Sequence, residues 1–476
     1  MPEMSDGSLP ISRRDRVDIP QIQLDFRSAQ KRIMDFREVV VPFDVTHAKS
    51  EASRCIHCPD PPCIQACPLN NPIPSALWQI EKGDFIEAAE LFFSTSNMPR
   101  ICGRICPQEQ LCEGSCVLNA SGEAIHIGAL EAFVTDYHFR MKSSKANLIN
   151  NIDKKVAVIG AGPAGLACAE EIALKGYSVT VFEAKPRPGG LLMYGIPGFK
   201  LEYTVLAEKI SQLYLLGINF EFNITIGEEK VIDDLIEQGF DAVFIGVGAG
   251  VDSPMKIPGE DLNGVYNATE FLVRGNVDAE FLPEDFAGLP VVGEKVAVIG
   301  GGDTASDCVR TARRLGAVEV YCLYRRTEKE MPGMAKDRKM AREEGTQYLF
   351  LTQPVGFHSN NQGQINQVEC VKMIMGDKDK FGRRRPNSKP GSNFLIDIDT
   401  VILALGYMPY ASIGETTPGL ETYRDGLIVI DKETCMTNRE GIFAGGDAVN
   451  GPDLVVTAIA DGRKAANAIH QFLTSK

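Results

Sequence analysis

The stretch Val156-Ala-Val-Ile-Gly-Ala-Gly-Pro-Ala-Gly165 decides the fold of this 476-residue chain. Its apolar start predicts a buried strand, its Gly-x-Gly-x-x-Gly run a tight turn, and the Ala-rich pattern from Pro163 to Lys175 a helix. This order is typical of a dinucleotide-binding βαβ unit. The first glycine allows the turn, the second lets a pyrophosphate approach the backbone, and the third lets the helix pack on the strand. The pyrophosphate then faces the helix N-terminus.

An acidic residue stands where such units hold a ribose. Glu183 ends the predicted strand 179–182, about 20 residues beyond the glycine run, and its carboxylate can accept hydrogen bonds from ribose hydroxyls. Strand, turn, helix, second strand and acid are all in register, which disfavours the alternative of a chance glycine-rich turn. The predicted contacts of this first site are Gly160, Gly162, Pro163, Ala164, Gly165 and Glu183.

The residues Val-Ala-Val-Ile-Gly recur at 296–300, so the unit occurs twice. Its turn is the G-x-G-x-x-A variant, and the next strand, 318–324, ends without the acid of the first unit and is followed at once by two arginines. Paired guanidinium groups bind a ribose 2′-phosphate that a carboxylate would repel, although two arginines could also simply cap a strand. We therefore predict FAD at the first site and NADPH at the second. The predicted NADPH contacts are Gly300, Gly302, Asp303, Thr304, Ala305, Arg325 and Arg326.

A block of cysteines precedes both units. Eight of the thirteen cysteines follow the spacings Cys55-x2-Cys58-x4-Cys63-x3-Cys67-Pro and Cys102-x3-Cys106-x5-Cys112-x3-Cys116. The chain shows no sign of export, so metal is a better explanation than disulfides. Zinc sites usually pair cysteines as two separated knuckles. The first run departs from the bacterial ferredoxin spacing only in x4 for x2, so we predict two 4Fe–4S clusters, with zinc as the alternative.

Composition excludes several classes of function. Hydrophobic residues make up 44% and charged residues 24%, as in an ordinary folded soluble protein. The net charge of −14 argues against nucleic acid or an anionic membrane as the main partner. There is no apolar run near the roughly 18 residues of a membrane span, and the first residues are too charged for a signal peptide. We expect a cytoplasmic protein.

The length suggests about three domains. We predict an N-terminal arm (1–35), an α-helical iron–sulfur domain (36–148), an FAD-binding domain (149–290 and 411–476) and an NADPH-binding domain (291–410) inserted into it. The fold class is therefore α/β, with two tandem Rossmann-like domains after a helical domain. Helices are expected at 85–93 and 125–140. The basic stretch 378–393 is expected to be an exposed loop, with its three arginines at 383–385 in a solvated turn.

Two further motifs resemble the two-dinucleotide-binding flavoprotein disulfide reductase superfamily. They are Arg187-Pro-Gly-Gly-Leu-Leu192 and Gly445-Gly-Asp447, and the closing stretch 457–463 also resembles the terminal flavin-side helix of that superfamily. The nucleotide domains lack a redox-active Cys-x-x-Cys, so electrons are expected to leave the flavin through the cysteine block. The resemblance implies FAD contacts from Arg187, Gly190, Leu191, Gly446, Asp447, Asp461 and Gly462, with Asp447 near the ribityl phosphate.

In two-cluster ferredoxins the last cysteine of a run serves the other cluster, and a similar exchange is plausible here. Cys55, Cys58 and Cys63 would then share a cluster with Cys116, and a second cluster would be held by Cys67, Cys106 and Cys112. The region also resembles the N-terminal part of dihydropyrimidine dehydrogenase, where a side-chain oxygen serves as a ligand. That resemblance implies Glu131 as a ligand and leaves open whether Cys102 or Glu131 completes the second cluster.

Over nearly its whole length the chain resembles the small (β) subunits of NADPH-dependent glutamate synthases. The resemblance rests on the motifs 101–107, 111–116, 194–200 and 322–327. It implies electron transfer from NADPH through FAD and the clusters to a large subunit that makes glutamate from glutamine and 2-oxoglutarate. The chain also resembles the large subunit of NADPH-dependent ferredoxin oxidoreductases, some of them electron-bifurcating, which would serve another partner. A non-catalytic zinc-binding interaction protein is the third alternative. We expect no catalytic acid or base, since hydride transfer to a flavin requires none.

Overall fold

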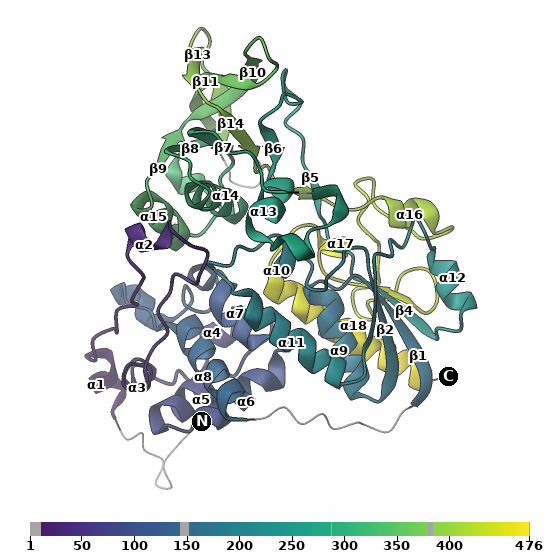
Figure 1. Ribbon diagram of the computed structural model, residues 1–476. Coiled ribbons are helices and arrows are strands. Elements are labelled where there is room, and N and C mark those ends of the chain that lie inside the picture. The colour runs from purple at the N-terminus through teal and green to yellow at the C-terminus, as the bar shows by residue number, and fades with distance from the viewer. Residues whose placement is uncertain (1–10, 143–151, 287, 379–383, 476) are drawn as a thin grey trace.

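The computed structural model describes residues 11–142, 152–286, 288–378 and 384–475. A helical unit lies beside two α/β units, each built on its own parallel sheet (Figure 1). The predicted fold class is confirmed. None of the helices in these ranges is long and apolar enough to cross a membrane.

The helical unit contains the cysteine block. Its core includes the fully buried side chains of Leu77, Phe92 and Leu130. Two helices of the unit fall on the helices expected at 85–93 and 125–140. Its main elements are α1 (Arg13–Val17), α2 (Ala29–Arg32), α3 (Val45–Ser53), α4 (Pro62–Gln65), α5 (Ile73–Lys82), α7 (Pro99–Ile105), the 3₁₀ turns η1 (Gln108–Gln110) and η2 (Val117–Ser121), and the two expected helices, α6 (Phe85–Thr95) and α8 (Ile127–Met141).

The first parallel sheet has the strand order β16-β4-β1-β2-β3. The last four residues of β1 are all buried, because helices cover both faces of a parallel sheet. One strand, β16, comes from near the C-terminus, so the two ends of the α/β region share one sheet. The strands are β1 (Ile152–Ile159), β2 (Tyr177–Glu183), β3 (Asn219–Phe222), β4 (Ala242–Ile245) and β16 (Ile442–Ala444), and the helices are α9 (Pro163–Leu174), α10 (Leu191–Tyr194), α11 (Tyr203–Leu215), α12 (Ile232–Glu237), α17 (Asp447–Asn450) and α18 (Val455–Thr474).

The second parallel sheet has the order β6-β14-β7-β8-β9. Its first strand corrects the sequence analysis, which assigned residues up to 290 to the first domain. Val265 to Asn267 instead pair with Val401 to Leu403, so this segment belongs to the second sheet. The elements are β6 (Val265–Asn267), α13 (Ala268–Asn276), β7 (Lys295–Ile299), α14 (Asp303–Arg314), β8 (Glu319–Tyr324), α15 (Ala335–Glu343), β9 (Thr346–Phe350) and β14 (Thr400–Leu403).

An antiparallel sheet projects from the second unit, at the top of Figure 1. It consists of β10 (Thr352–Ser359), β11 (Ile365–Lys378), β12 (Arg384–Ser388) and β13 (Phe394–Asp397). The expectation of an exposed loop over 378–393 is wrong for β12, because this segment pairs with the end of the long strand β11. Arg384 and Arg385 therefore lie on a strand, and Arg383 falls outside the described residues. A short antiparallel pair, β5 (Val251–Asp252) with β15 (Tyr407–Met408), lies where the chain crosses between the two units.

Candidate cofactor sites

Two of the three glycines in the first turn, Gly160 and Gly165, have no room for a side chain. Gly160 has a φ of +96°, and a Cβ atom there would lie 2.5 Å from the Gly246 carbonyl oxygen. A Cβ at Gly165 would lie 1.9 Å from the Gly160 oxygen. Helix α9 begins directly after Gly162, without a side-chain cap. Its first N–H groups are therefore free of a capping side chain and are the kind of donor that binds phosphate.

Glu183 closes the side of this turn. One carboxylate oxygen accepts a hydrogen bond from the Ala161 N–H at 2.7 Å, and the other accepts one from the Lys185 N–H at 2.9 Å. Burial raises the pKa of Glu183. Each oxygen still has a lone pair for a further donor such as a ribose hydroxyl.

The motifs predicted to contact FAD converge on the same turn. A Cβ at Gly190 would lie 2.7 Å from the Gly162 Cα, and one at Gly446 would lie 2.9 Å from the Ala164 Cβ. A Cβ at Gly462 would lie 2.2 Å from the Ala164 oxygen. The segments that carry Gly190, Gly446 and Gly462 thus lie against the start of α9, at distances that only glycine allows.

The remaining residues predicted to contact FAD also lie near the first glycine turn or on the segments that reach it: Asp447, Asp461, Arg187 and Leu191. Asp461 accepts hydrogen bonds from the Gly446 N–H at 3.0 Å and from the Asn450 amide at 2.7 Å, which fixes the approach to Asp447. Burial raises the pKa of Asp447 to about 6. The guanidinium of Arg187 lies 4.5 Å from the ring centre of Phe281. The side chain of Leu191 is exposed.

The second glycine turn is built in the same way. Gly300 has a φ of +156°, and a Cβ there would lie 2.2 Å from the Ala404 oxygen. Gly302 precedes α14, which again lacks a side-chain cap. Ala305 is buried at the third position of the motif, and the Thr304 hydroxyl is hydrogen-bonded to Tyr407.

Arg325 and Arg326 follow β8 directly, on the same unit as this turn. Arg325 is exposed, and the Nε of Arg326 donates to the Arg384 carbonyl at 3.3 Å. A guanidinium has five N–H donors, so both arginines can still bind a phosphate.

Four of the eight cysteines, Cys55, Cys58, Cys63 and Cys116, line one cavity, together with apolar side chains such as Ile73 and Leu77. Burial, and then the neighbouring thiols, raise the pKa of Cys55 and of Cys63 to about 12. Four thiols in an apolar cavity suit a metal cluster, because bound metal stabilises thiolates that burial alone disfavours.

The remaining candidates form a second group. Burial, followed by Glu131 and Cys102, raises the pKa of Cys67. A hydrogen bond with Cys102, then burial and the charges of Glu131 and Cys112, raise the pKa of Cys106. The structure therefore brings five candidate ligands together and includes both Cys102 and Glu131. Among the described residues, no three His, Cys, Asp or Glu side chains form a group of the kind that holds a single metal ion.

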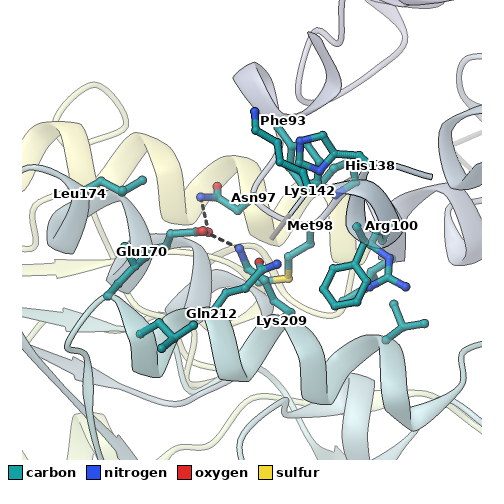
Figure 2. A pocket seen from close by; sticks show the side chains of 16 residues that line it. Phe93, Asn97, Met98, Arg100, His138, Lys142, Glu170, Leu174, Lys209 and Gln212 are labelled. Carbon is teal, nitrogen blue, oxygen red and sulfur yellow. Dashed lines mark hydrogen bonds and ion pairs between the residues drawn. The ribbon is translucent and has the colours of Figure 1, made fainter. Parts of the chain in front are cut away.

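A separate pocket lies between the helical unit and the first α/β unit (Figure 2). Met98 and Ile101 line it, together with residues of α8, α9 and α11. Its cationic groups are already paired: Arg100 with Asp136 and Glu208, Lys209 with Glu170, and Lys142 with Glu90. The pocket thus lacks free cations for an anionic ligand and lies apart from both glycine turns.

Sequence reasoning missed the loop that covers the second turn. The Gly333 N–H donates to the Gly301 oxygen at 3.1 Å, and the Met334 N–H donates to Asp303 at 2.9 Å. A Cβ at Gly333 would lie 2.9 Å from the Gly302 carbonyl carbon. The Pro332-Gly333 pair signals a turn, but nothing in the sequence shows which segment that turn contacts.

Comparisons with known proteins agree with this arrangement. Residues 32–143 match the family described as dihydropyrimidine dehydrogenase domain II, 4Fe-4S cluster, and residues 154–462 match the pyridine nucleotide-disulphide oxidoreductases. The chain is 41% identical over 466 residues to the glutamate synthase (NADPH) small chain of Escherichia coli, with 96% of this chain and 97% of that one covered.

Two other proteins are also similar. The NADPH-Fe(3+) oxidoreductase subunit beta of Geobacter sulfurreducens is 35% identical, over 87% of this chain and 63% of that one. The structure of Mycobacterium tuberculosis FprA in complex with NADPH matches with a TM-score of 0.58 and 19% identity, over 68% of this chain and 85% of that one. This last likeness shows that the two proteins share a fold.

Proposed function

Because the chain belongs to the family of the NADPH-dependent glutamate synthase small chains, we propose that it passes electrons from NADPH to a partner subunit. It is an NADPH-dependent oxidoreductase of the pyridine nucleotide-disulphide type, and its cofactors are FAD, NADPH and 4Fe–4S clusters. When bound, FAD exchanges a hydride with NADPH, and the clusters carry single electrons.

The residues of each site fit its group. The first turn and the motifs around it would hold FAD, with its pyrophosphate at the start of α9 and its ribose on Glu183. The second turn would hold NADPH, with Arg325 and Arg326 on the 2′-phosphate. The two cysteine groups would hold one cluster each. The protein would contribute placement and water exclusion, so no general acid or base is assigned.

The observation that carries this proposal is the position of the second cysteine group. Cys67 and Cys102 pack in the same hydrophobic core as Leu192 and Met193 of the FAD-side segment. Cys55 instead packs within the core of the helical unit. The second group would therefore receive electrons from the flavin, and the first group would pass them on.

The large subunit of glutamate synthase is the proposed partner. Coverage of 97% of the Escherichia coli small chain supports this choice. The similarity to an NADPH-Fe(3+) oxidoreductase subunit favours a second candidate, in which the same module supplies another acceptor. The relatives are oxidoreductases, so they do not support the zinc-binding alternative. We place the protein in the cytoplasm, and we place the start of the NADPH-binding domain before β6 rather than at 291.

Anaerobic purification of the native complex tests the proposal. We expect flavin and iron absorption, bleaching by NADPH, and co-purification of a large amidotransferase chain that forms glutamate from glutamine and 2-oxoglutarate. A different co-purifying redox protein would favour the second candidate. Colourless protein, or flavin that NADPH does not reduce, would refute the electron-transfer function.

A further inference from the structure

The segment 194–200 was singled out by sequence, yet none of the sites described above uses it. It follows α10 and precedes α11, so it belongs to the first α/β unit, but its last two residues extend into the second. Phe199 is fully buried there, with the guanidinium carbons of Arg310 and Arg314 at 4.4 and 4.0 Å from its ring centre. Cation–π contacts of this kind are favourable, and more so where water is excluded.

Lys200 lies between two helices of the second unit. Its Nζ is 2.7 Å from an oxygen of Asp307 on α14 and 2.6 Å from an oxygen of Asp337 on α15. In the described part of the chain neither of these oxygens has a hydrogen bond to another group, and Lys200 is the cation that pairs with both of them. The other oxygen of Asp337 also lies 3.5 Å from the Arg310 guanidinium. Burial alone would lower the pKa of Lys200, but the two carboxylates raise it above its ordinary value.

Residues 32–39, where the N-terminal arm meets the helical unit, lie on the other side of this contact. The Val39 N–H donates to the Phe199 backbone carbonyl at 3.1 Å, and the Nε of Arg314 donates to the backbone carbonyl of Asp35 at 3.1 Å. Arg32, at the end of α2, pairs with Glu343 of α15 at 2.6 Å. Figure 1 shows α2 beside α15. Lys200 therefore lies in a junction closed from two directions.

The junction around Lys200 joins the two nucleotide-binding units beside the helix that follows the second glycine turn. Helix α14 begins at the second glycine turn, and Asp307 lies one helical turn below its first residue, Asp303. Lys200 thus ties a segment of the FAD-side unit to the helix whose start would bind the NADPH pyrophosphate. Hydride transfer needs a donor and acceptor in near contact, and a misplacement of about 1 Å can cost about 100-fold in rate.

Resting on the proposed function, we propose that Lys200 is a positioning residue, which fixes the NADPH-binding unit against the FAD-binding unit for hydride transfer. Without the ammonium, the buried carboxylate of Asp307 would lose the ion pair with Lys200, and Asp337 would keep only Arg310 at 3.5 Å, so the junction would open to admit water. The nucleotide turn itself would be unchanged. The rate of flavin reduction should therefore fall while NADPH binding persists.

The test compares Lys200→Met with Lys209→Met. Lys209 is a matched control, since it is also buried and paired, with Glu170 at 2.5 Å, but this pair does not involve the NADPH-binding unit. In anaerobic stopped-flow experiments we expect Lys200→Met to slow flavin reduction by NADPH roughly 10- to 100-fold and to change the Kd of NADP⁺ by at most about threefold. Lys200→Arg should recover much of the rate, and Lys209→Met should match the native protein.

A second readout needs no bound nucleotide. Hydrogen–deuterium exchange should rise in 194–201 and in α14 and α15 of Lys200→Met, and should stay at the native level there in Lys209→Met. If Lys200→Met fails to fold, Lys200→Met/Asp307→Asn removes one charge of each sign and should fold, yet still reduce its flavin slowly. Native rates in either variant, or unchanged exchange in Lys200→Met, would overturn the inference. If NADPH fails to reduce the native flavin, the proposed function fails instead.

Discussion

Replacing Arg325 and Arg326 with alanine should convert an NADPH-selective protein into one that barely distinguishes NADPH from NADH. The two guanidinium groups follow β8, and no carboxylate stands where Glu183 lies in the first unit. A hydrogen bond to a charged group contributes roughly 1.5 to 3 kcal/mol, and the exposure of Arg325 favours the lower end. Two such interactions give about 3 kcal/mol, or roughly 100-fold in kcat/KM.

The assay is steady-state oxidation of each nucleotide with an artificial electron acceptor. We expect kcat/KM for NADPH to fall roughly 100-fold in the double variant and kcat/KM for NADH to stay within about threefold, because NADH lacks the 2′-phosphate. Arg342→Ala is the control: this arginine lies on the same unit but is already paired with Glu328 at 2.8 Å. Equal losses for the two nucleotides would refute the assignment, because the arginines would then not contact the 2′-phosphate.

Three further predictions concern the other sites. Gly462→Ala should abolish flavin binding, because its Cβ would lie 2.2 Å from the Ala164 oxygen. The loss is measured as missing flavin absorption in the visible spectrum. A variant that still binds flavin would show that this close approach is not needed for the flavin site. Cys102→Ala and Glu131→Ala are compared by a chemical iron assay. The variant that removes a cluster ligand should lose about half of the iron, and the other should keep all of it. Full iron content in both variants would show that neither residue is an essential ligand. In flavin-free protein, Asp447→Asn should stabilise the fold above pH 6 and have little effect below pH 4. The raised pKa of this carboxyl means that the folded state binds its proton more tightly than the unfolded state, so the stability of the native protein falls as pH rises through that range. Urea unfolding of the native protein and the variant at pH 4 and pH 7 measures the change in stability. An equal effect of the substitution at both pH values would contradict the prediction.

The sequence predicts what local sterics determine. Each glycine turn, with the strand before it and the helix after it, follows from a few neighbouring residues, and the structure contains both turns. Strand pairing is different, because β6 and β12 are identified only by their distant partners, β14 and β11. Short polar or mixed segments carry little signal of their own, so the sequence predicts the wrong unit for β6 and a loop for β12.

At the candidate cluster sites, too, the sequence predicts what depends on local spacing and misses what depends on how helices pack. Cysteine spacing predicts eight ligands and a division into two groups, and the structure places four of them on one cavity. Spacing cannot choose between Cys102 and Glu131, because the choice depends on how α7 and α8 pack. Lys200 was equally hidden: Asp307 and Asp337 sit on charged helices, where a solvated surface is the ordinary expectation.

The same loop that covers the second glycine turn also contacts the helical unit. Glu109 accepts hydrogen bonds from the N–H groups of Ala335 and Lys336 at the start of α15, and Gln110 donates to the Pro332 oxygen at 3.1 Å. Both residues belong to η1, which lies between Cys106 and Cys112 in the chain. Through this loop the second glycine turn is thus linked to a segment that carries two proposed cluster ligands, and through α14 and Lys200 it is linked to the first α/β unit. An electron path over three units requires fixed distances, and these contacts show how the chain holds its second nucleotide unit against both of the others.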